Sequence, residues 1–168
     1  MTIQNTCIED IDAVFYLYDE ASKYQKRHQK HYWNGFDRAQ VEKEIKESRH
    51  FIIIEKDTIV CTFLITYEDP LIWQAANKDP ALYLHRIATH PKYRGRGYIK
   101  SIIEWSKVHA KAKNKLFIRL DTHTGNDKIN AYYTSCGFTN KGISYLDPNS
   151  PIPEHYKAGA FTLFEIKL

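Results

Sequence analysis

The residues best suited to do chemistry lie in Tyr83–Ile99, where a glycine-rich turn joins a predicted strand to a predicted helix. An apolar, β-prone run ends at His90-Pro91, and the basic connection Lys92–Gly97 follows before helix-patterned residues begin. The first amides of a helix have no acceptor inside the helix, and the helix dipole adds positive potential there. Glycines let a ligand approach the main chain closely, and arginines add charge. The stretch therefore predicts a site for a phosphate or pyrophosphate group.

Two motifs in this chain resemble those of the GCN5-related N-acetyltransferase (GNAT) family. Arg94–Tyr98 (RGRGY) matches the first five positions of a six-residue motif, which reads Arg or Gln, two residues, Gly, one residue, then Gly or Ala. Ile99 occupies the sixth position and departs from that motif. Downstream, Asn126–Phe138 resembles the family's signature of Asn, a helix, an aromatic-Tyr pair, three residues and Gly-Phe. With both motifs in the expected order, the chain is identified as a member of the family.

The resemblance implies acetyl-coenzyme A (acetyl-CoA) as cosubstrate. Its pantetheine arm would lie along the fourth strand like an added strand, held through main-chain hydrogen bonds. The positions that match the family's cosubstrate-binding residues are Ile87, Ala88, Thr89, Arg94, Gly95, Arg96, Gly97, Ile99, Lys100, Asn126 and Tyr133. Asn126 is equally suited to cap the helix that it precedes. Because the loop contact is made by backbone N–H groups, Ile99 is expected to shift the cosubstrate without abolishing its binding.

Tyr133 matches the second aromatic residue of the family's pair, which implies that it acts as general acid. Acyl transfer from a thioester must expel a thiolate, and a phenol placed at the sulfur can protonate it or donate a hydrogen bond to it. Tyr133 also shares an apolar helical stripe with Ile129, Tyr132 and Cys136, which predicts a packed position. Both roles are compatible if the ring is packed and the hydroxyl faces the site.

His85 is the candidate general base, because an acceptor ammonium must lose a proton before it attacks and imidazole titrates in a suitable range, at roughly pH 6.5 when unperturbed. Strand alternation places Tyr83, His85 and Ile87 on one face unless a bulge intervenes. The strand resembles that of arylalkylamine N-acetyltransferases, in which a histidine at this position belongs to the base relay. Two alternatives stay open, a hydrogen-bonded strand histidine without a catalytic role and a water relay as the base, and so do His123 and His155 in loops.

Aromatic residues predict the walls of an acceptor site. In this fold the site would be shaped by residues 24–36, 68–73 and 149–156, and the residues expected to contact the acceptor are Tyr32, Trp33, Trp73 and Tyr83. Aromatic residues in loops also often serve only as packing lids. The sequence leaves the acceptor open among a polyamine, an aryl amine, an amino acid, an aminoglycoside and a protein N-terminus.

Other functions fit these residues less well than a transferase. A dinucleotide-binding turn needs a third glycine, which Gly95–Lys100 lacks, and the Walker pattern is absent. A non-catalytic module that only binds acyl-CoA would lack a working acid, and Tyr133 counts against it. A nucleic-acid-binding domain would need its basic residues gathered on one face with stacking aromatics, whereas Lys23–Lys30 and Lys107–Lys115 fit solvated helix ends better.

Composition indicates a single domain over residues 1–168, with 43% hydrophobic residues and a net charge of +4. This mildly basic balance suits an anionic ligand. The three cysteines are far apart and predict neither a disulfide framework nor a metal site. No signal region and no apolar stretch of ~18 residues is evident, so a cytoplasmic protein is expected. The expected partner is a small-molecule or peptide amine, with neither nucleic acid nor membrane, and homodimer formation is left open.

Helices alternate with strands along the chain, which predicts an α/β or α+β layered fold. The family resemblance makes this the GNAT fold, with a central mixed, mostly antiparallel twisted sheet flanked by helices. Thr6 and Glu9 predict a capping box for the first helix. The expected helices are residues 7–25, 38–48, 97–112 and 126–136, and the expected strands are residues 2–4, 51–55, 58–67, 82–89, 116–121, 142–145 and 161–167, with residues 68–80 as a loop. A hairpin turn is expected at Lys56-Asp57, and the helix over residues 97–112 is expected to place Ile99, Ile102, Ile103 and Ser106 on one face.

Overall fold

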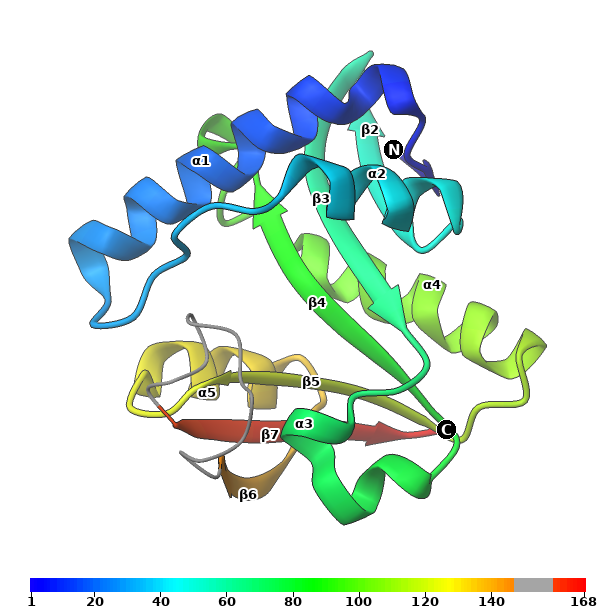
Figure 1. Cartoon of the computed structure of the whole chain (residues 1–168), viewed down its shortest axis with the longest axis vertical. Coiled ribbons are helices and arrows are strands. Elements are labelled where there is room, and N and C mark those ends of the chain that lie inside the picture. The colour runs from blue at the N-terminus through cyan, green and yellow to red at the C-terminus, as the bar shows by residue number, and fades with distance from the viewer. Residues whose placement is uncertain (147–158) are drawn as a thin grey trace. The chain divides into compact units, whose positions relative to one another are not determined.

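The computed structural model describes residues 1–146 and 159–168, which form two compact units (Figure 1). The first unit comprises residues 1–65 and 85–98, and the second comprises residues 66–84 and 99–168. The chain passes between the units at the end of strand β3 (Thr58–Thr66), within strand β4 (Ala81–Thr89) and at the start of helix α4 (Tyr98–Ala112), so these three elements contribute residues to both.

The elements follow the predicted alternation. The strands are β1 (Thr2–Asn5), β2 (His50–Glu55), β3 (Thr58–Thr66), β4 (Ala81–Thr89), β5 (Phe117–His123), β6 (Thr139–Tyr145) and β7 (Ala160–Lys167). The α-helices are α1 (Ile11–His28), α2 (Arg38–Lys46), α3 (Pro70–Trp73), α4 (Tyr98–Ala112) and α5 (Asp127–Ser135), and the 3₁₀ helices are η1 (Ile8–Asp10), η2 (Gln74–Lys78) and η3 (Pro91–Tyr93). Within the described ranges, no helix is both long enough and apolar enough to cross a membrane.

The strand order is β1-β2-β3-β4-β5-β7-β6. Strand β2 pairs antiparallel with β1 and β3, and β7 pairs antiparallel with β5 and β6. The pair β4–β5 is parallel and covers only Ala81–Tyr83 against Phe117–Arg119. This arrangement confirms the predicted mixed, mostly antiparallel sheet with helices.

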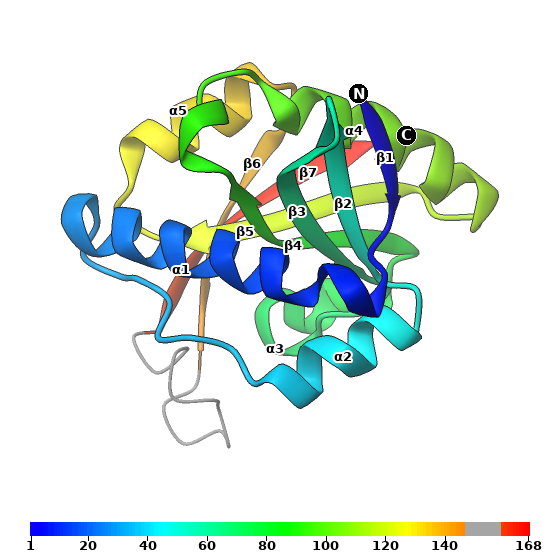
Figure 2. The ribbon, with the colours of Figure 1, turned by 90° about the horizontal axis from the view of Figure 1, so that it is seen from above.

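In the first unit, α1 and α2 cover one face of the strands (Figure 2). Their apolar stripes meet in a core that contains the fully buried Val14 of α1, Val41 of α2 and Ile52 of β2. Strands β2 and β3 are joined by Lys56 and Asp57, both in the left-handed region with φ of 46° and 61°. Two such residues form the tight turn that matches the twist of a hairpin, as the sequence predicts.

In the second unit, β5 is paired with β4 on one side and with β7 on the other, and β7 is also paired with β6. The predicted apolar face of α4 is confirmed, because Ile99, Ile102, Ile103 and Ser106 are all buried. Helix α5 lies against β6 and β7. The unit thus has its own strands and its own helices.

A buried guanidinium, that of Arg119 on β5, ties together four segments of the second unit. It pairs with Asp79 at 2.7 Å and Glu165 at 2.8 Å, and it donates hydrogen bonds to the carbonyl of Ala76 and the hydroxyl of Tyr83. The two carboxylates compensate the positive charge of Arg119, as a buried arginine requires. The segment η2 and strands β4, β5 and β7 therefore share one ionic centre.

Two local expectations were wrong. Thr6 does not cap α1 with Glu9, because its hydroxyl lies 2.8 Å from His50 Nδ1, and instead the Cys7 N–H donates to the Asp10 carboxylate at 2.9 Å. Residues 68–80 are not a plain loop but contain α3 and η2. Asp69 caps α3 by accepting from the Ile72 N–H at 3.2 Å, a role to which the sequence Asp-Pro is suited.

Candidate functional site

The loop between β4 and α4 has the main-chain geometry expected of an anion-binding turn. Gly95 and Gly97 have φ of 79° and 77°, in the left-handed region that favours glycine, and Gly97 directly precedes the first residue of α4. A Cβ added at either position would meet no atom within 4 Å, so the space beside both residues is open. Open main chain next to the free amides of a helix start fits the pyrophosphate of acetyl-CoA.

The two arginines of the loop are held by different contacts. Arg94 donates to the main-chain carbonyl of Glu20 at 3.0 Å, and its guanidinium lies over the Tyr24 ring at 4.5 Å. Arg96 lies over the Tyr93 ring at 4.5 Å, forms an ion pair with Glu55 at 3.5 Å and remains about half exposed. Arg94 therefore fixes the loop to α1, whereas Arg96 would exchange its ion pair with Glu55 for an anion that binds the loop.

The residues expected to line the pantetheine arm form the end of β4. Ala88 is buried in the core with α1 and α2, whereas Ile87 and Thr89 are half-buried. The His90 N–H donates to the Val60 carbonyl at 2.8 Å, so pairing with β3 lasts to the final residue before Pro91. Among the loop-end positions, Ile99 is buried on the apolar face of α4 and Lys100 is exposed. Contact of these residues with the cosubstrate stays a prediction.

His85 is half-buried on β4 and is followed by Arg86, whose φ of 48° interrupts the regular strand. The strand alternation assumed for Tyr83, His85 and Ile87 is thus broken at this point. Burial lowers the pKa of His85 to about 4, and the neighbouring cations Arg86 and Arg49 add to that effect. His85 is therefore uncharged at neutral pH, which is the form of imidazole that can accept a proton.

Tyr133 lies on α5 with its ring packed and its side chain half-buried. The ring centroid is 5.6 Å from that of Phe164 and 5.9 Å from that of Phe138. The predicted packed stripe is only partly formed, because Tyr132 is 43% exposed. Asn126 caps α5 by accepting from the Ile129 N–H at 3.1 Å, which confirms its capping role. Its contact with the cosubstrate stays a prediction.

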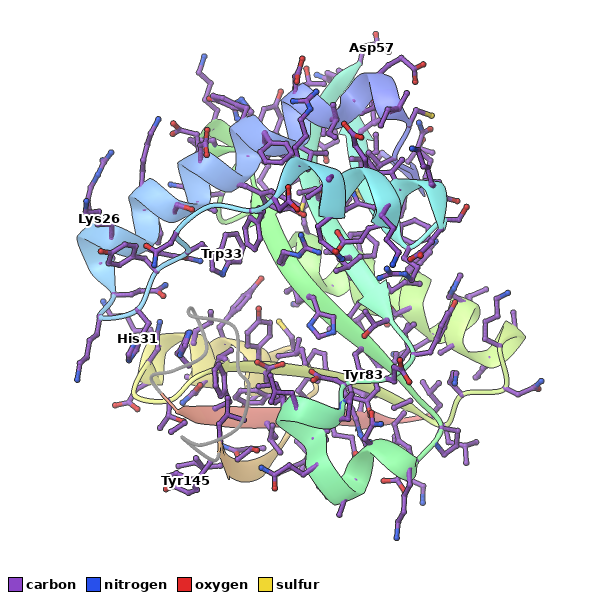
Figure 3. The ribbon with its side chains drawn as sticks, viewed as in Figure 1. Lys26, His31, Trp33, Asp57, Tyr83 and Tyr145 are labelled. Atoms are coloured by element: carbon purple, nitrogen blue, oxygen red, sulfur yellow. The ribbon has the colours of Figure 1, made fainter. Side chains whose placement is uncertain are left out.

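The aromatic residues expected near the acceptor divide between the units, and in the first unit they are Tyr32 and Trp33. Trp33, labelled in Figure 3, packs against Tyr18 and Phe36 with centroid distances of 5.9 Å and 5.3 Å. Tyr32 is 42% exposed and has the Lys26 ammonium 5.7 Å from its ring centroid. Trp33 therefore contributes to packing, and Tyr32 is the more accessible of the two rings.

In the second unit, Trp73 and Tyr83 are core residues. Tyr83 (Figure 3) is fully buried, and its ring lies 5.9 Å from that of Trp73. The Arg119 guanidinium lies over the Trp73 ring at 4.4 Å and donates to the Tyr83 hydroxyl at 3.2 Å. These contacts give both rings a packing role around Arg119, and contact with an acceptor stays a prediction.

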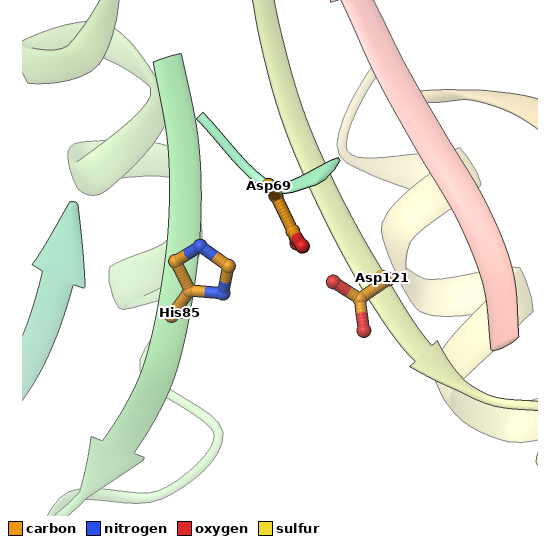
Figure 4. A group of neighbouring side chains, drawn as sticks. All are labelled: Asp69, His85 and Asp121. Carbon is orange, nitrogen blue, oxygen red and sulfur yellow. The ribbon is translucent and has the colours of Figure 1, made fainter. Parts of the chain in front are cut away.

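Two carboxylates that no sequence motif singled out lie close together in the second unit. Oxygens of Asp69 and Asp121 are within 4.8 Å of one another (Figure 4). Burial, with a smaller contribution from the Asp69 charge, raises the pKa of Asp121 to about 7. Burial raises the pKa of Asp69 to about 6, against the opposing effect of its hydrogen bond from the Ile72 N–H. Carboxylates that titrate near neutrality can donate or accept protons in catalysis.

A signal for this pair was present in the sequence, though a weak one. Asp121 follows the apolar run of β5, and Asp69 precedes a proline.

Of the other expected bases, His123 is half-buried with its ring 4.6 Å from that of Phe161. His155 and the whole predicted acceptor segment 149–156 lie outside the described residues.

Comparisons with known proteins agree with the two motifs. The sequence profile of the acetyltransferase (GNAT) family matches residues 10–138. An uncharacterized N-acetyltransferase, YesJ of Bacillus subtilis, is 21% identical over 138 residues, which cover 77% of each chain. The crystal structure of a GNAT-family acetyltransferase from Listeria monocytogenes superposes with a TM-score of 0.77 at 20% identity, covering 99% of this chain and 94% of the other. The Salmonella typhimurium protein yncA, solved with its cofactor acetyl-CoA, has a TM-score of 0.69 at 14% identity, covering 100% and 94%.

Replacement of Gly97 by valine is expected to weaken acetyl-CoA binding far more than Arg96→Ala. A β-branched residue is strained at φ of 77° and would place a side chain in the open space beside the loop. Calorimetric titration of both variants with acetyl-CoA measures the difference, and thermal unfolding checks that each variant is folded. Equal affinity of Gly97→Val and the parent would contradict the loop assignment.

Asp121→Asn is expected to flatten the pH dependence of stability. In the folded chain Asp121 keeps its proton up to about pH 7, whereas an unfolded aspartate loses it near pH 3.9. The folded state therefore binds the extra proton between these values, and the free energy of unfolding falls as pH rises through this window. The asparagine variant should lack that fall, which amounts to about 1.4 kcal/mol per pKa unit.

Urea unfolding across this pH window measures the slope for the parent and for Asp121→Asn. Glu104→Gln, which removes a carboxylate that is 71% exposed on α4 of the same unit, is the matched control. Equal slopes for the parent and Asp121→Asn would show that this carboxyl is ionised in the folded chain.

Proposed function

We propose, from the premise that the chain belongs to the acetyltransferase (GNAT) family, that it moves the acetyl group of acetyl-CoA to a primary amine by direct attack in a ternary complex. Membership of the family makes the chain an acetyl-CoA-dependent acyltransferase. The direct attack, the primary amine and the proton-transfer residues are the proposed parts. The observation that carries the proposal is the loop at 94–98, in which two left-handed glycines with open space beside them lead into α4.

The loop and the end of β4 would hold the cosubstrate. The amides at the start of α4 and the exposed Arg96 supply donors and charge for the pyrophosphate. Main-chain groups of Ile87–Thr89 would hydrogen-bond the pantetheine arm. Asn126 contributes at the start of α5, where its side chain also caps the helix. These contacts fix the thioester in place so that an incoming amine reacts as if the step were intramolecular.

His85 would remove the proton that the attacking amine must lose. As the amine nitrogen forms its bond to the thioester carbonyl carbon, the proton passes to the imidazole, directly or through water. The pKa of His85, lowered to about 4, keeps the ring unprotonated at neutral pH. Asp121, whose pKa is about 7, is the second candidate for this role, supported by its closeness to Asp69.

Tyr133 would complete the reaction at the leaving group. When the carbon–sulfur bond breaks, the departing thiolate takes a proton from the phenol, and solvent returns a proton to Tyr133 afterwards. The packing of its ring against Phe138 and Phe164 supports this role, because a ring fixed on one side presents its hydroxyl in a defined direction. The products are the acetylated amine and coenzyme A.

The experiment that tests the proposal incubates the chain with acetyl-CoA and a panel of primary amines and follows the release of free thiol. Turnover with at least one amine and none without protein is the expected result. A chain that binds acetyl-CoA tightly but releases no thiol with polyamines, aryl amines, amino acids, aminoglycosides or peptides would instead be a binding module.

Tyr133→Phe is expected to lower kcat by ~10²-fold or more, the usual scale for a proton-transfer group, while the chain stays folded. The substitution keeps the ring against Phe138 and Phe164 and removes only the hydroxyl. Tyr132→Phe removes a hydroxyl from the adjacent, more exposed position and is the matched control. If Tyr133→Phe turned over at the parental rate, Tyr133 would be a packing residue only.

His85→Gln is expected to remove the acidic limb of the pH–rate profile and to lower kcat/KM near neutrality. A base with its pKa lowered to about 4 is active throughout the range above that pH, so its limb lies well below the roughly pH 6.5 of an unperturbed imidazole. The control is His28→Gln, an exposed histidine of the same unit. A limb near pH 7 that survives in His85→Gln and disappears in Asp121→Asn would move the base to the carboxylate.

A further inference from the structure

The main chain of β4 breaks its regular conformation at an arginine. Arg86 has φ of 48°, whereas strand residues have strongly negative φ, and a residue with a side chain rarely adopts this left-handed region. Such a residue persists only where surrounding contacts determine it, and residues of this kind gather at functional sites. Its neighbours are His85 on one side and Ile87 on the other, both expected site residues.

The contacts that hold Arg86 come from α1, from α2 and from Phe36, two residues before α2 begins. Its guanidinium forms an ion pair with Glu44 of α2, and the two side chains are only 13% and 3% exposed. The same guanidinium lies over the Phe36 ring at 4.9 Å and the Tyr18 ring at 5.7 Å. Gln40 donates a second hydrogen bond to the same Glu44 oxygen at 2.9 Å. Arg86 is thus held in two ways: the Glu44 carboxylate pairs with its charge, and the aromatic rings pack against its guanidinium.

The aromatic surface under Arg86 is itself fixed by buried hydrogen bonds. The Tyr18 hydroxyl lies 2.8 Å from His50 Nε2, and His50 Nδ1 lies 2.8 Å from the Thr6 hydroxyl. Burial lowers the pKa of His50 to about 3, with Arg86 and Arg49 adding to the effect, so its ring is neutral. The hydrogen bonds that link Thr6, His50 and Tyr18 therefore fix the Tyr18 ring under the guanidinium.

Stability alone is a weak reason for this ion pair. The second oxygen of Glu44 is buried and has no hydrogen-bond partner among the residues that the structure describes. A buried ion pair with an unsatisfied oxygen loses hydration that its mutual attraction only partly replaces, and apolar side chains of similar size often stabilise a fold as well or better. A polar arrangement of this kind is better suited to imposing one particular conformation than to adding stability.

We propose that Glu44 and Arg86 are positioning residues that clamp the left-handed break in β4 and thereby set the direction of the His85 side chain and of the Ile87 main chain. The inference rests on the proposed role of His85 as base. A left-handed residue turns the adjoining peptide groups away from the regular alternation of a strand, so the groups on either side of Arg86 point where the clamp holds them. The clamp acts through the main chain and touches no reacting atom.

Four substitutions separate the charge of the clamp from the conformation that it holds. Glu44→Gln keeps the shape and removes the negative charge, and Arg86→Lys keeps a positive charge without the planar guanidinium. Arg86→Ala and Arg86→Gly both remove the guanidinium. Alanine would be strained at the φ of 48° found at this position, whereas glycine adopts that φ freely. Arg38→Ala, which loses exposed ion pairs to Asp12 and Glu42 near the same helix, is the control.

The expected result is a loss of kcat without a matching loss of cosubstrate affinity. Misplacement of a catalytic group by about 1 Å costs on the order of 10²-fold, so Glu44→Gln and Arg86→Ala should lower kcat by roughly 10- to 100-fold. The KM for acetyl-CoA should rise by less than kcat falls, because the pyrophosphate loop is left intact and, of the main-chain groups expected on the pantetheine arm, only those of Ile87 adjoin the clamp. Arg86→Gly should recover part of the kcat that Arg86→Ala loses, although glycine removes more side chain.

A second readout reports the geometry without any turnover. The amide ¹H–¹⁵N resonances of residues 85–88 should shift in Glu44→Gln and Arg86→Ala relative to the parent, and they should stay in place in Arg38→Ala. Unshifted resonances in Glu44→Gln would overturn the clamp, and so would equal kcat in Arg86→Ala and Arg86→Gly. Parental turnover in His85→Gln would instead overturn the base while the resonances still report on the clamp.

Discussion

The last main-chain hydrogen bond of β4 is the constraint on which the candidate site depends. The His90 N–H donates to the Val60 carbonyl at 2.8 Å, and the next residue, Pro91, has no N–H to continue the ladder. The chain must therefore leave the sheet, and it does so through Gly95 and Gly97 in left-handed conformations before α4 begins. Amides that neither a strand nor a helix can satisfy come together at this turn, and an anion is the ligand that they favour.

Each unit also contains one buried arginine that needs compensation, and the two are compensated differently. Arg119 is paired with Asp79 and Glu165 and fully enclosed, so it joins η2 to three strands as a structural centre. Arg86 is paired with one carboxylate, Glu44, and lies on a residue of unfavourable φ. The first arrangement pairs the buried charge on several sides, whereas the second leaves a strained residue next to a candidate catalytic histidine and an oxygen of Glu44 with no partner among the described residues.

Proton transfer near neutrality has candidates in both units for the same physical reason. Removal from water disfavours whichever form carries charge, so burial lowers the pKa of His85 and raises that of Asp121. Between about pH 4 and pH 7 both groups are therefore neutral: His85 is then free to accept a proton, whereas Asp121 still carries one and becomes a proton acceptor only as pH rises past about 7. The two shifts have opposite directions, and this is why a pH–rate profile can tell the two groups apart.

The sequence by itself determined the features that depend on neighbouring residues. The glycine loop, the Lys56-Asp57 turn and the Asn126 cap were all predicted, because turn and cap chemistry is decided within a few residues. Only the tertiary structure decided the Asp69–Asp121 pair, the packed state of Tyr83 and the break at Arg86. Burial and pKa shifts arise from groups far apart in the chain, as with Arg86 and Glu44, which are 42 residues apart. No local pattern encodes that proximity, because it exists only once helices and strands have packed.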